Sequence, residues 1–247
     1  MHDQLRLTSS APSTCSFSGM DDYNITLDQP HFIQYPKPIS YNFNSRGFRD
    51  TEWPDDNLSQ MIWCVGDSFT MGLGQPFNEI WCSVLKTKTQ INTINISMNG
   101  ASNNWIARKI NYITSNIAPE YLVVQWSYIH RRESSDTSLP DFERKLNARD
   151  EPESTQYKNF IECLISVERC KKTTKIIHTF IPNWNSLLSR KCKVLFDTEN
   201  VWHGICNYNN IEPLLVLDWE QLDYARDKWH YDIQTSNKYV RYIMDLL

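Results

Sequence analysis

The chain has 247 residues, of which 40% are hydrophobic and 22% are charged, so it has enough apolar side chains for a full core. Its formal net charge of −4 argues against a nucleic-acid partner. No apolar run reaches the roughly 18–20 residues of a membrane span, and the N-terminus lacks the apolar stretch of a secretion signal. The seven cysteines include no Cys-x-x-Cys pair, which favours a reducing compartment. We therefore expect a cytoplasmic protein that binds neither nucleic acid nor a membrane.

Residues 1–58 differ from the rest of the chain, because they show little hydrophobic periodicity and contain many turn-forming residues. We expect this segment to be an irregular N-terminal arm packed on a single domain formed by residues 59–247. Within the arm, short strands are expected at Phe32–Tyr35 and Tyr41–Phe43.

In residues 59–247, apolar runs alternate with segments of helical spacing. The runs predict buried strands at Met61–Val65, Ile91–Ser97, Tyr121–Trp126, Lys175–Ile181 and Leu214–Leu217. Helical periodicity occurs at residues 77–85, 106–117, 157–170 and 239–246. This alternation predicts an α/β fold in which a parallel sheet lies between two layers of helices.

The connection from His130 to Glu153 is unusually long, and it carries five Lys or Arg and seven Asp or Glu residues. It leaves the carboxyl end of the third predicted strand, the edge at which open α/β sheets bind ligands. Two interpretations stay open for this segment: a binding loop and a solvated insertion.

Ser68 follows the first buried strand, and three of the seven glycines lie within nine residues around it, at Gly66, Gly72 and Gly74. A serine in this position lies at the carboxyl edge of the sheet, where backbone N–H groups can face an anion. Its hydroxyl can attack an acyl carbon if a base lies within hydrogen-bond reach and a further group orients that base.

The candidate base is His230, which precedes the last predicted helix and is therefore also expected at the carboxyl edge. Asp227, three residues earlier, can turn back onto the imidazole, and Asp223 and Asp232 are alternatives. The remaining histidines are His2, His31, His130, His178 and His203, of which His178 lies in an apolar strand and is expected in the core.

Three sequence blocks resemble those of the SGNH (GDSL-type) hydrolase superfamily: Gly66-Asp67-Ser68-Phe69, Gly100 after the next strand, and Asp227-x-x-His230. The resemblance covers roughly residues 59–247. It implies a three-layer α/β/α sandwich with a mostly parallel, flavodoxin-like sheet, and ester hydrolysis without a metal or another cofactor. By position it implies Ser68 as nucleophile, His230 as general base and Asp227 as its orienting carboxylate. The backbone N–H groups of Ser68 and Gly100 would form part of the oxyanion hole.

The sequence departs from the superfamily after the third strand, where members usually carry Gly-x-Asn-Asp and the Asn is the third oxyanion donor. This chain has no Asn there. The loss of one oxyanion donor typically costs about 10²–10³ in rate. Candidates for a replacement donor or for substrate binding are Asp67, Asn103, Asn104, Ser127, Tyr128, Arg131 and Arg132.

Two tryptophans, Trp126 and Trp229, adjoin the expected site, where an indole ring can stack on a sugar. Arg49 lies in the segment Asn44–Asp50, which looks like a stretch that precedes the nucleophile strand in some members of the superfamily. A salt bridge that pins the arm is expected for it, and a contact with the site is the alternative. The run after Trp126 is similar to that of phage-encoded or environmental bacterial members, and a phage-encoded protein could be associated with the virion.

These patterns favour a serine esterase that hydrolyses short acyl esters, such as acetyl groups on a saccharide. The expected partner is thus a small-molecule or saccharide ester, with no prediction of oligomeric state. An O-acyltransferase with the same three residues and a non-catalytic module that binds glycans or assembles with partners are the alternatives. The chain has no P-loop, no dinucleotide fingerprint, no Gly-x-Ser-x-Gly and no zinc-type spacing.

Overall fold

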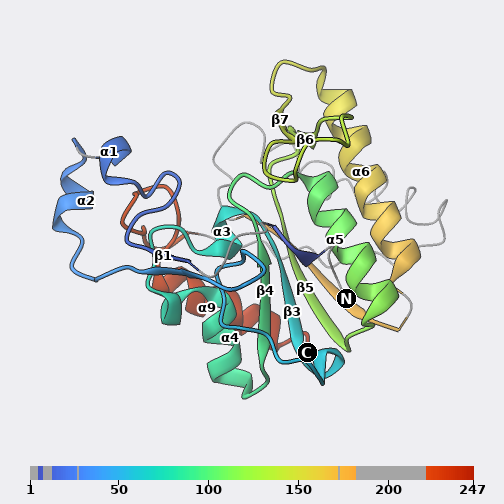
Figure 1. Cartoon of the computed structure of the whole chain (residues 1–247), viewed down its shortest axis with the longest axis horizontal. Helices are drawn as coiled ribbons and strands as arrows, with labels where there is room; N and C mark the ends of the chain where they lie inside the picture. The colour runs from blue at the N-terminus through green and yellow to red at the C-terminus, as the bar shows by residue number, and fades with distance from the viewer. Residues whose placement is uncertain (1–4, 8–12, 27, 172, 182–220) are drawn as a thin grey trace.

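The computed structural model describes residues 5–7, 13–26, 28–171, 173–181 and 221–247 (Figure 1). Its centre is a sheet of four parallel strands in the order β4 (Thr93–Ser97), β3 (Ile62–Gly66), β5 (Tyr121–Trp126) and β8 (Lys175–Phe180). These four strands confirm the corresponding predictions. The strand expected at Leu214–Leu217 lies outside the described residues.

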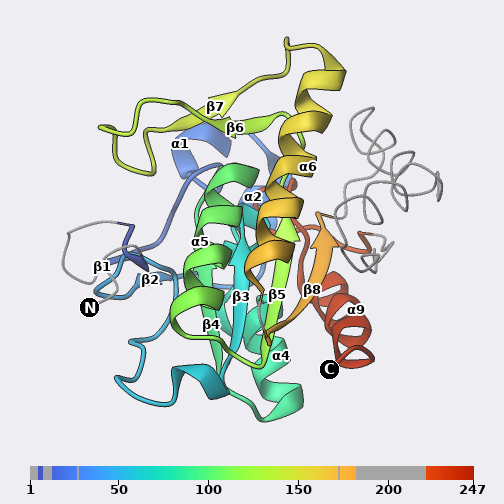
Figure 2. The same cartoon turned by 90° about the vertical axis from the view of Figure 1, so that its right-hand side faces the viewer.

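Helices cover both faces of the sheet (Figures 1 and 2). On one face lie α5 (Asn103–Asn116) and α6 (Glu153–Cys170), and on the other lie α4 (Trp81–Thr89) and α9 (Ile233–Met244). Strand β3 is buried along its whole length, which explains why its sequence is a continuous apolar run. Trp63 and Val65 belong to the core under α5 and α6, whereas Cys64 belongs to the core under α4 and α9. The predicted three-layer α/β/α sandwich with a parallel sheet is therefore confirmed.

Helix α5 begins where its sequence provides a cap. The Ser102 hydroxyl accepts a hydrogen bond from the backbone N–H of Trp105 at 3.0 Å, and Ile106, Ile110 and Ile113 are buried at helical spacing. The helix expected from residue 77 starts later than predicted. A 3₁₀ turn at Phe77–Glu79 comes first, and then an extended Ile80 interrupts the helical backbone before α4.

The long connection after β5 forms an antiparallel hairpin of β6 (Arg131–Glu133) and β7 (Lys145–Asn147). In Figure 2 the hairpin lies above the N-terminal end of α5, at the carboxyl edge of the sheet. Arg108 of α5 forms ion pairs with Glu133 at 2.6 Å and with Asp141 at 2.9 Å, so the hairpin is fastened to that helix. The segment is thus a structured element at the edge where the site was expected.

The N-terminal arm contains β1 (Ser13–Cys15), paired with β2 (Tyr41–Phe43), and the short helices α1 (Tyr23–Thr26) and α2 (Pro30–Gln34). A 3₁₀ turn at Leu58–Gln60 leads into β3. The strand predicted at Tyr41–Phe43 is confirmed, but the one predicted at Phe32–Tyr35 is wrong. Pro30 occupies the first turn of α2, where its fixed φ favours a helix and its missing N–H has no cost.

Arg49 is buried, and its guanidinium donates hydrogen bonds to backbone carbonyl groups after β3 rather than to a carboxylate. The acceptors include Met71 O at 3.1 Å and Gln75 O at 2.6 Å. Arg49 therefore ties the arm to the segment that follows Ser68, as expected. Among the described residues it does so without the expected salt bridge, because the acceptors are neutral carbonyl oxygens.

Candidate active site

Ser68 is the first residue of α3 (Ser68–Met71), directly after β3, and it is almost fully buried. Asp67 caps this short helix, because its carboxylate accepts a hydrogen bond from the backbone N–H of Phe69 at 3.0 Å. A side chain at Gly66 would approach the carbonyl oxygen of Gln125 to 3.0 Å and Thr70 Cβ to 2.8 Å. The strand can thus turn sharply into α3 only with a glycine before Asp67.

The structure brings three of the predicted residues together in one line of hydrogen bonds. His230 Nε2 lies 2.8 Å from Ser68 Oγ, and His230 Nδ1 lies 2.5 Å from Asp227 Oδ2. Because a carboxylate only accepts, Nδ1 must carry the proton, which leaves Nε2 free to accept from the serine hydroxyl. This is the arrangement in which an imidazole can remove a proton from a serine.

The Asp227 carboxylate is held rigidly within its own turn. Its Oδ1 accepts hydrogen bonds from the backbone N–H groups of Trp229 at 2.9 Å and His230 at 3.0 Å. Burial by itself raises the pKa of Asp227, but the positive charge and hydrogen bonds of His230 outweigh it and hold that pKa below its usual value. Asp227 is therefore ionised at neutral pH and can stabilise an imidazolium.

The two alternative carboxylates have other partners. Asp223 accepts from the backbone N–H groups of Gln234 at 2.7 Å and Thr235 at 3.0 Å, so it caps the start of α9. Asp232 accepts from Tyr35 Oη at 2.8 Å and Lys37 Nζ at 2.9 Å in the arm. Of the three acidic residues considered, Asp227 is the one in contact with the His230 ring.

The other described histidines also have other partners. His178 is buried between Trp126 and Glu168, as expected for a core residue, while His31 binds the carbonyl of Ala225 and His130 contacts Arg149. His2 and His203 lie outside the described residues.

Gly100 follows β4 at the same edge of the sheet as Ser68. Its φ of +71° is in the left-handed region that favours glycine. Two residues later Ser102 caps α5, so Gly100 lies just before the N-terminus of that 14-residue helix. A helix N-terminus carries partial positive charge, which favours an anion in its vicinity.

No protein-family model and no curated protein matches the sequence. Several solved structures do match the fold. A family two carbohydrate esterase from Clostridium thermocellum, solved with cellohexaose, has a TM-score of 0.51 and 16% identity, over 79% of this chain and 66% of that chain. A protein from Desulfitobacterium hafniense, described as lipolytic and of the G-D-S-L family, has a TM-score of 0.50 and 15% identity, over 76% of this chain and 99% of that chain. The chain has the SGNH hydrolase fold.

A carbohydrate esterase family 2 enzyme with a carbohydrate-binding domain, from Myceliophthora fergusii, is similar to a comparable degree. Its TM-score is 0.50 at 12% identity, over 80% of this chain and 67% of that chain. The present chain thus spans about two thirds of these two carbohydrate esterases. At such identities the likeness establishes a shared SGNH fold, on which the remaining candidate residues can now be placed.

Asp67, the residue directly before Ser68, forms a polar cluster with Ser127 and Arg131. Asp67 Oδ2 accepts from Ser127 Oγ at 2.6 Å and from Arg131 Nη1 at 2.9 Å, and Asp67 itself is fully buried. The ion pair compensates the buried negative charge. Since Ser127 donates its hydroxyl proton to Asp67, this proton is not available to an oxyanion in this SGNH fold.

Asn103 and Asn104, two other candidate donors, use their amides to fix neighbouring segments. Asn103 accepts from the backbone N–H of Ser127 at 2.9 Å and donates to the carbonyl of Tyr128 at 3.1 Å. Asn104 accepts from the backbone N–H of Glu133 at 3.2 Å and donates to Asn159 of α6. Asn103 thus shapes the turn after β5, and Asn104 joins the hairpin to both helices.

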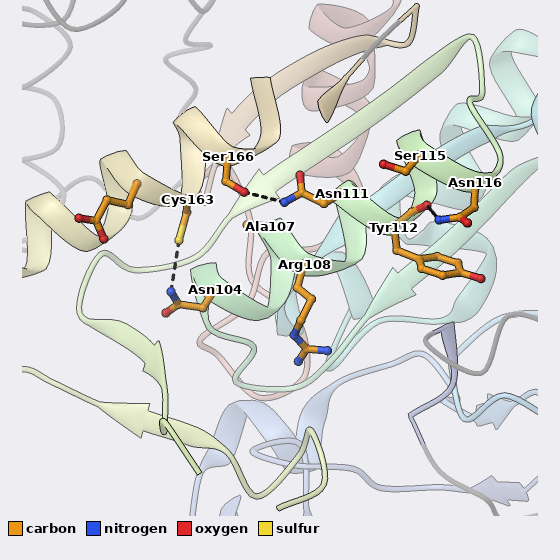
Figure 3. Close-up of a pocket in the computed structure, with 10 residues that line it drawn as sticks. Asn104, Ala107, Arg108, Asn111, Tyr112, Ser115, Asn116, Cys163 and Ser166 are labelled. Atoms are coloured by element: carbon orange, nitrogen blue, oxygen red, sulfur yellow. Dashed lines mark hydrogen bonds between the residues drawn. The ribbon is translucent and has the colours of Figure 1, made fainter. Parts of the chain in front are cut away.

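Asn104 also lines a groove of about 480 Å³ between α5 and α6 (Figure 3). In this view its amide points to Cys163, and the amide of Asn111 points to Ser166. None of Ser68, Asp227 and His230 lines the groove. It belongs to the helical layer and is separate from the candidate active site.

The two tryptophans differ in exposure. Trp126 is completely buried, packs edge-on against Phe160 and donates its indole N–H to His178, so it has no free face for a sugar. Its expected stacking role is therefore wrong, because the end of β5 lies inside the core. Trp229, the neighbour of His230, is 55% exposed and has a face available to a ligand.

Arg132 and Tyr128 are also placed by the hairpin. Arg132 forms an ion pair with Glu151, and the Tyr128 ring stacks on the His130 ring and also contacts the guanidinium of Arg131. Burial and the charge of Asp67 raise the pKa of Tyr128, so its hydroxyl stays protonated.

Lys145 lies near the site but was not predicted from the sequence, where it is one of many charged residues in the segment from 130 to 153. Lys145 of β7 reaches Gly100, and its Nζ donates to the carbonyl of Asn99 at 3.1 Å.

Within the described ranges, no three His, Cys, Asp or Glu side chains gather as they would around a metal ion. No helix in the described part of the chain is both long and apolar enough to cross a bilayer.

Proposed function

We propose that the chain is a carboxylic ester hydrolase in which Ser68, His230 and Asp227 act as a catalytic triad. The observation that carries the proposal is the continuous line of hydrogen bonds from Ser68 Oγ through the His230 ring to Asp227, with contacts of 2.8 Å and 2.5 Å. Ser68 and the Asp227–His230 turn come from distant parts of the chain and would not meet in this order for packing alone, since Asp227 and His230 are polar groups in a buried position.

The geometry supports a two-step acyl transfer. Ser68 Oγ attacks the acyl carbon while its proton moves to His230 Nε2, and the oxyanion that forms faces the backbone N–H groups of Ser68 and Gly100. His230 then gives the proton to the leaving alcohol, and an acyl-enzyme remains. A water molecule, deprotonated by the same nitrogen, releases the acid and restores the serine. Asp227 stabilises the imidazolium in both steps.

We further propose that the substrate is a short acyl ester, such as an acetyl group, on a saccharide. Trp229 supports this idea, because its exposed indole lies next to His230 and can stack on a sugar ring. The likeness to a carbohydrate esterase that was solved with cellohexaose points in the same direction.

The test is hydrolysis of 4-nitrophenyl acetate and of an acetylated cello-oligosaccharide by the whole chain. We expect Ser68→Ala to abolish both activities and to prevent labelling by a fluorophosphonate probe. Ser83→Ala, on the half-buried face of α4, is the matched control and should change neither. Equal activity of Ser68→Ala and the unchanged chain would refute the triad. Product analysis with an added sugar acceptor separates hydrolysis from acyl transfer.

A further inference from the structure

Two positive side chains of the β6–β7 hairpin lie beside the candidate oxyanion site. Arg131 starts β6 and Lys145 starts β7. Arg131 reaches Asp67, the residue before Ser68, with 2.9 Å between Nη1 and Oδ2. Lys145 reaches Gly100, where its Cδ and Nζ lie 3.4 Å and 3.7 Å from the position that a Cβ would occupy. The hairpin therefore places one positive side chain at Asp67 and another at Gly100.

The charge of Arg131 is compensated, but that of Lys145 is not. Arg131 forms an ion pair with the buried Asp67. Over the described ranges, Lys145 Nζ has no carboxylate within ion-pair distance, and the acceptor that it does have is the neutral carbonyl of Asn99.

Three acidic side chains in and next to the hairpin have other partners. Glu133 and Asp141 bind Arg108, and Glu151 binds Arg132. Glu133, the residue opposite Lys145 in the β6–β7 pair, is thus bound by the guanidinium of Arg108.

The surroundings of Lys145 favour an anion as the missing partner. Lys145 is an exposed residue, and the partial burial of its ammonium group together with the positive charge of Arg131 lowers its pKa. The N-terminus of α5, two residues beyond Gly100, adds partial positive charge from the same side. A negative group placed here would relieve the repulsion between Lys145 and Arg131 and would meet a charged donor.

We propose that Lys145 determines substrate specificity by binding a carboxylate of the ester substrate beside Gly100. The inference rests on the proposed esterase function and names the class of substrate: an ester that carries a carboxylate, as an acylated acidic sugar does. Charge-assisted hydrogen bonds from an ammonium to a carboxylate are stronger than neutral ones, so one such contact suffices to discriminate acidic from neutral substrates.

The experiment compares esters that differ in charge and little in size. 4-Acetoxybenzoate and 4-acetoxybenzamide test a carboxylate in the alcohol part, and 4-nitrophenyl glutarate and 4-nitrophenyl pentanoate test one in the acyl part. We expect Lys145→Gln to lower kcat/KM about tenfold for the acidic ester of at least one pair, chiefly through KM. The neutral esters should change less than about twofold, since they lack the group that Lys145 binds.

Three further variants or conditions sharpen the result. Lys145→Arg should keep most of the preference for the acidic ester, because it keeps the charge. Lys88→Gln, an exposed lysine on α4, removes the same charge away from the site and should leave both esters unchanged. Added salt should reduce the acidic preference of the unchanged chain more than that of Lys145→Gln.

Two results would overturn the proposal. If Lys145→Gln lowers kcat equally for acidic and neutral esters, Lys145 acts on the developing oxyanion and not on a substrate carboxylate. If it changes neither ester of either pair, Lys145 has no part in recognition. Failure of the underlying function looks different, because the unchanged chain and Ser68→Ala would then hydrolyse every ester at the same rate.

Discussion

Arg226 and Asp21 form a bidentate ion pair, with Nε–Oδ1 and Nη2–Oδ2 distances of 2.8 Å and 2.6 Å, across 205 positions of sequence. Arg226 directly precedes Asp227, so the arm holds the turn that carries the candidate acid and base. Asp21 also accepts from Tyr41 Oη, which in turn accepts from the backbone N–H of Gly74, and Gly74 O accepts from the N–H of Arg226. These contacts close a ring of hydrogen bonds that joins the arm, the segment after Ser68 and the turn at residues 225–230 (the His230 turn).

Breaking this ring should loosen the candidate active site. We expect Asp21→Asn to lower the free energy of unfolding by about 3 kcal/mol, because it leaves the guanidinium of Arg226 without its buried counter-charge. Urea unfolding measures this loss, and kcat for 4-nitrophenyl acetate should fall in parallel. Asp55→Asn, an exposed residue of the arm, is the control and should stay within about 0.5 kcal/mol. Unchanged stability and kcat in Asp21→Asn would mean that the arm does not position the turn.

The role of Asp227 is testable with an isosteric change. Asp227→Asn removes the charge that stabilises the imidazolium and allows the amide to donate to Nδ1, which favours the wrong tautomer of His230. We expect kcat/KM to fall by about 10⁴ at neutral pH, with little change in KM. Asp223→Asn is the comparison at a nearby carboxylate without contact to His230, and it should affect stability more than kcat. Similar losses of kcat in both variants would contradict the assignment of Asp227.

Gly74 lies where a side chain would collide with the His230 turn. Its φ is +75°, and a Cβ there would lie 3.0 Å from the backbone nitrogen of Arg226 and 2.8 Å from the Cβ of Ala225. Gly100 has a similar φ of +71°, but its nearest contact is the flexible side chain of Lys145 at 3.4 Å. Both Ala variants should pay about 1–2 kcal/mol for the left-handed backbone. Thermal unfolding should show a clearly greater loss for Gly74→Ala, and equal losses would contradict the predicted collision.

The stability of the fold should depend on pH through His130. This histidine is buried, its Nδ1 has no hydrogen-bond partner among the described residues, and the positive groups of Arg149 and Arg131 face it. Burial first, and these charges second, lower its pKa from 6.5 to about 4. Between these two values the unfolded chain takes up the proton more readily than the folded one, so stability falls as pH falls through this range.

The check is a comparison of urea unfolding between the unchanged chain and His130→Gln from pH 7 to pH 4.5. The difference between the two isolates His130 from other groups, such as Asp50, whose pKa burial raises to about 6 and which therefore acts in the opposite direction. We expect the unchanged chain to lose more stability than the variant over this range. A constant difference would show that His130 is protonated equally in both states.

The positions of the four central strands and of the candidate site at their carboxyl ends could be predicted from the sequence. A strand that is buried on both faces is largely apolar, so β3 was visible as a continuous run, and β4, β5 and β8 were visible as segments rich in Ile, Leu and Val. Because carboxyl ends of parallel strands share one edge, the positions of Ser68 and Gly100 after such runs located the candidate site. The short helix at Pro30–Gln34 was missed because a few residues of arm sequence carry no periodicity to distinguish a helix from a strand.

The α/β/α architecture and the serine at the sheet edge could be predicted from the amino-acid sequence, because burial patterns and strand ends are local properties. The partners of the polar side chains could be seen only in three dimensions, because a hydrogen bond depends on which groups the rest of the chain brings near. The structure showed that Asn103, Asn104 and Ser127 bind protein groups, that Trp126 is enclosed in the core, and that Lys145, from the far side of a hairpin, lies against Gly100.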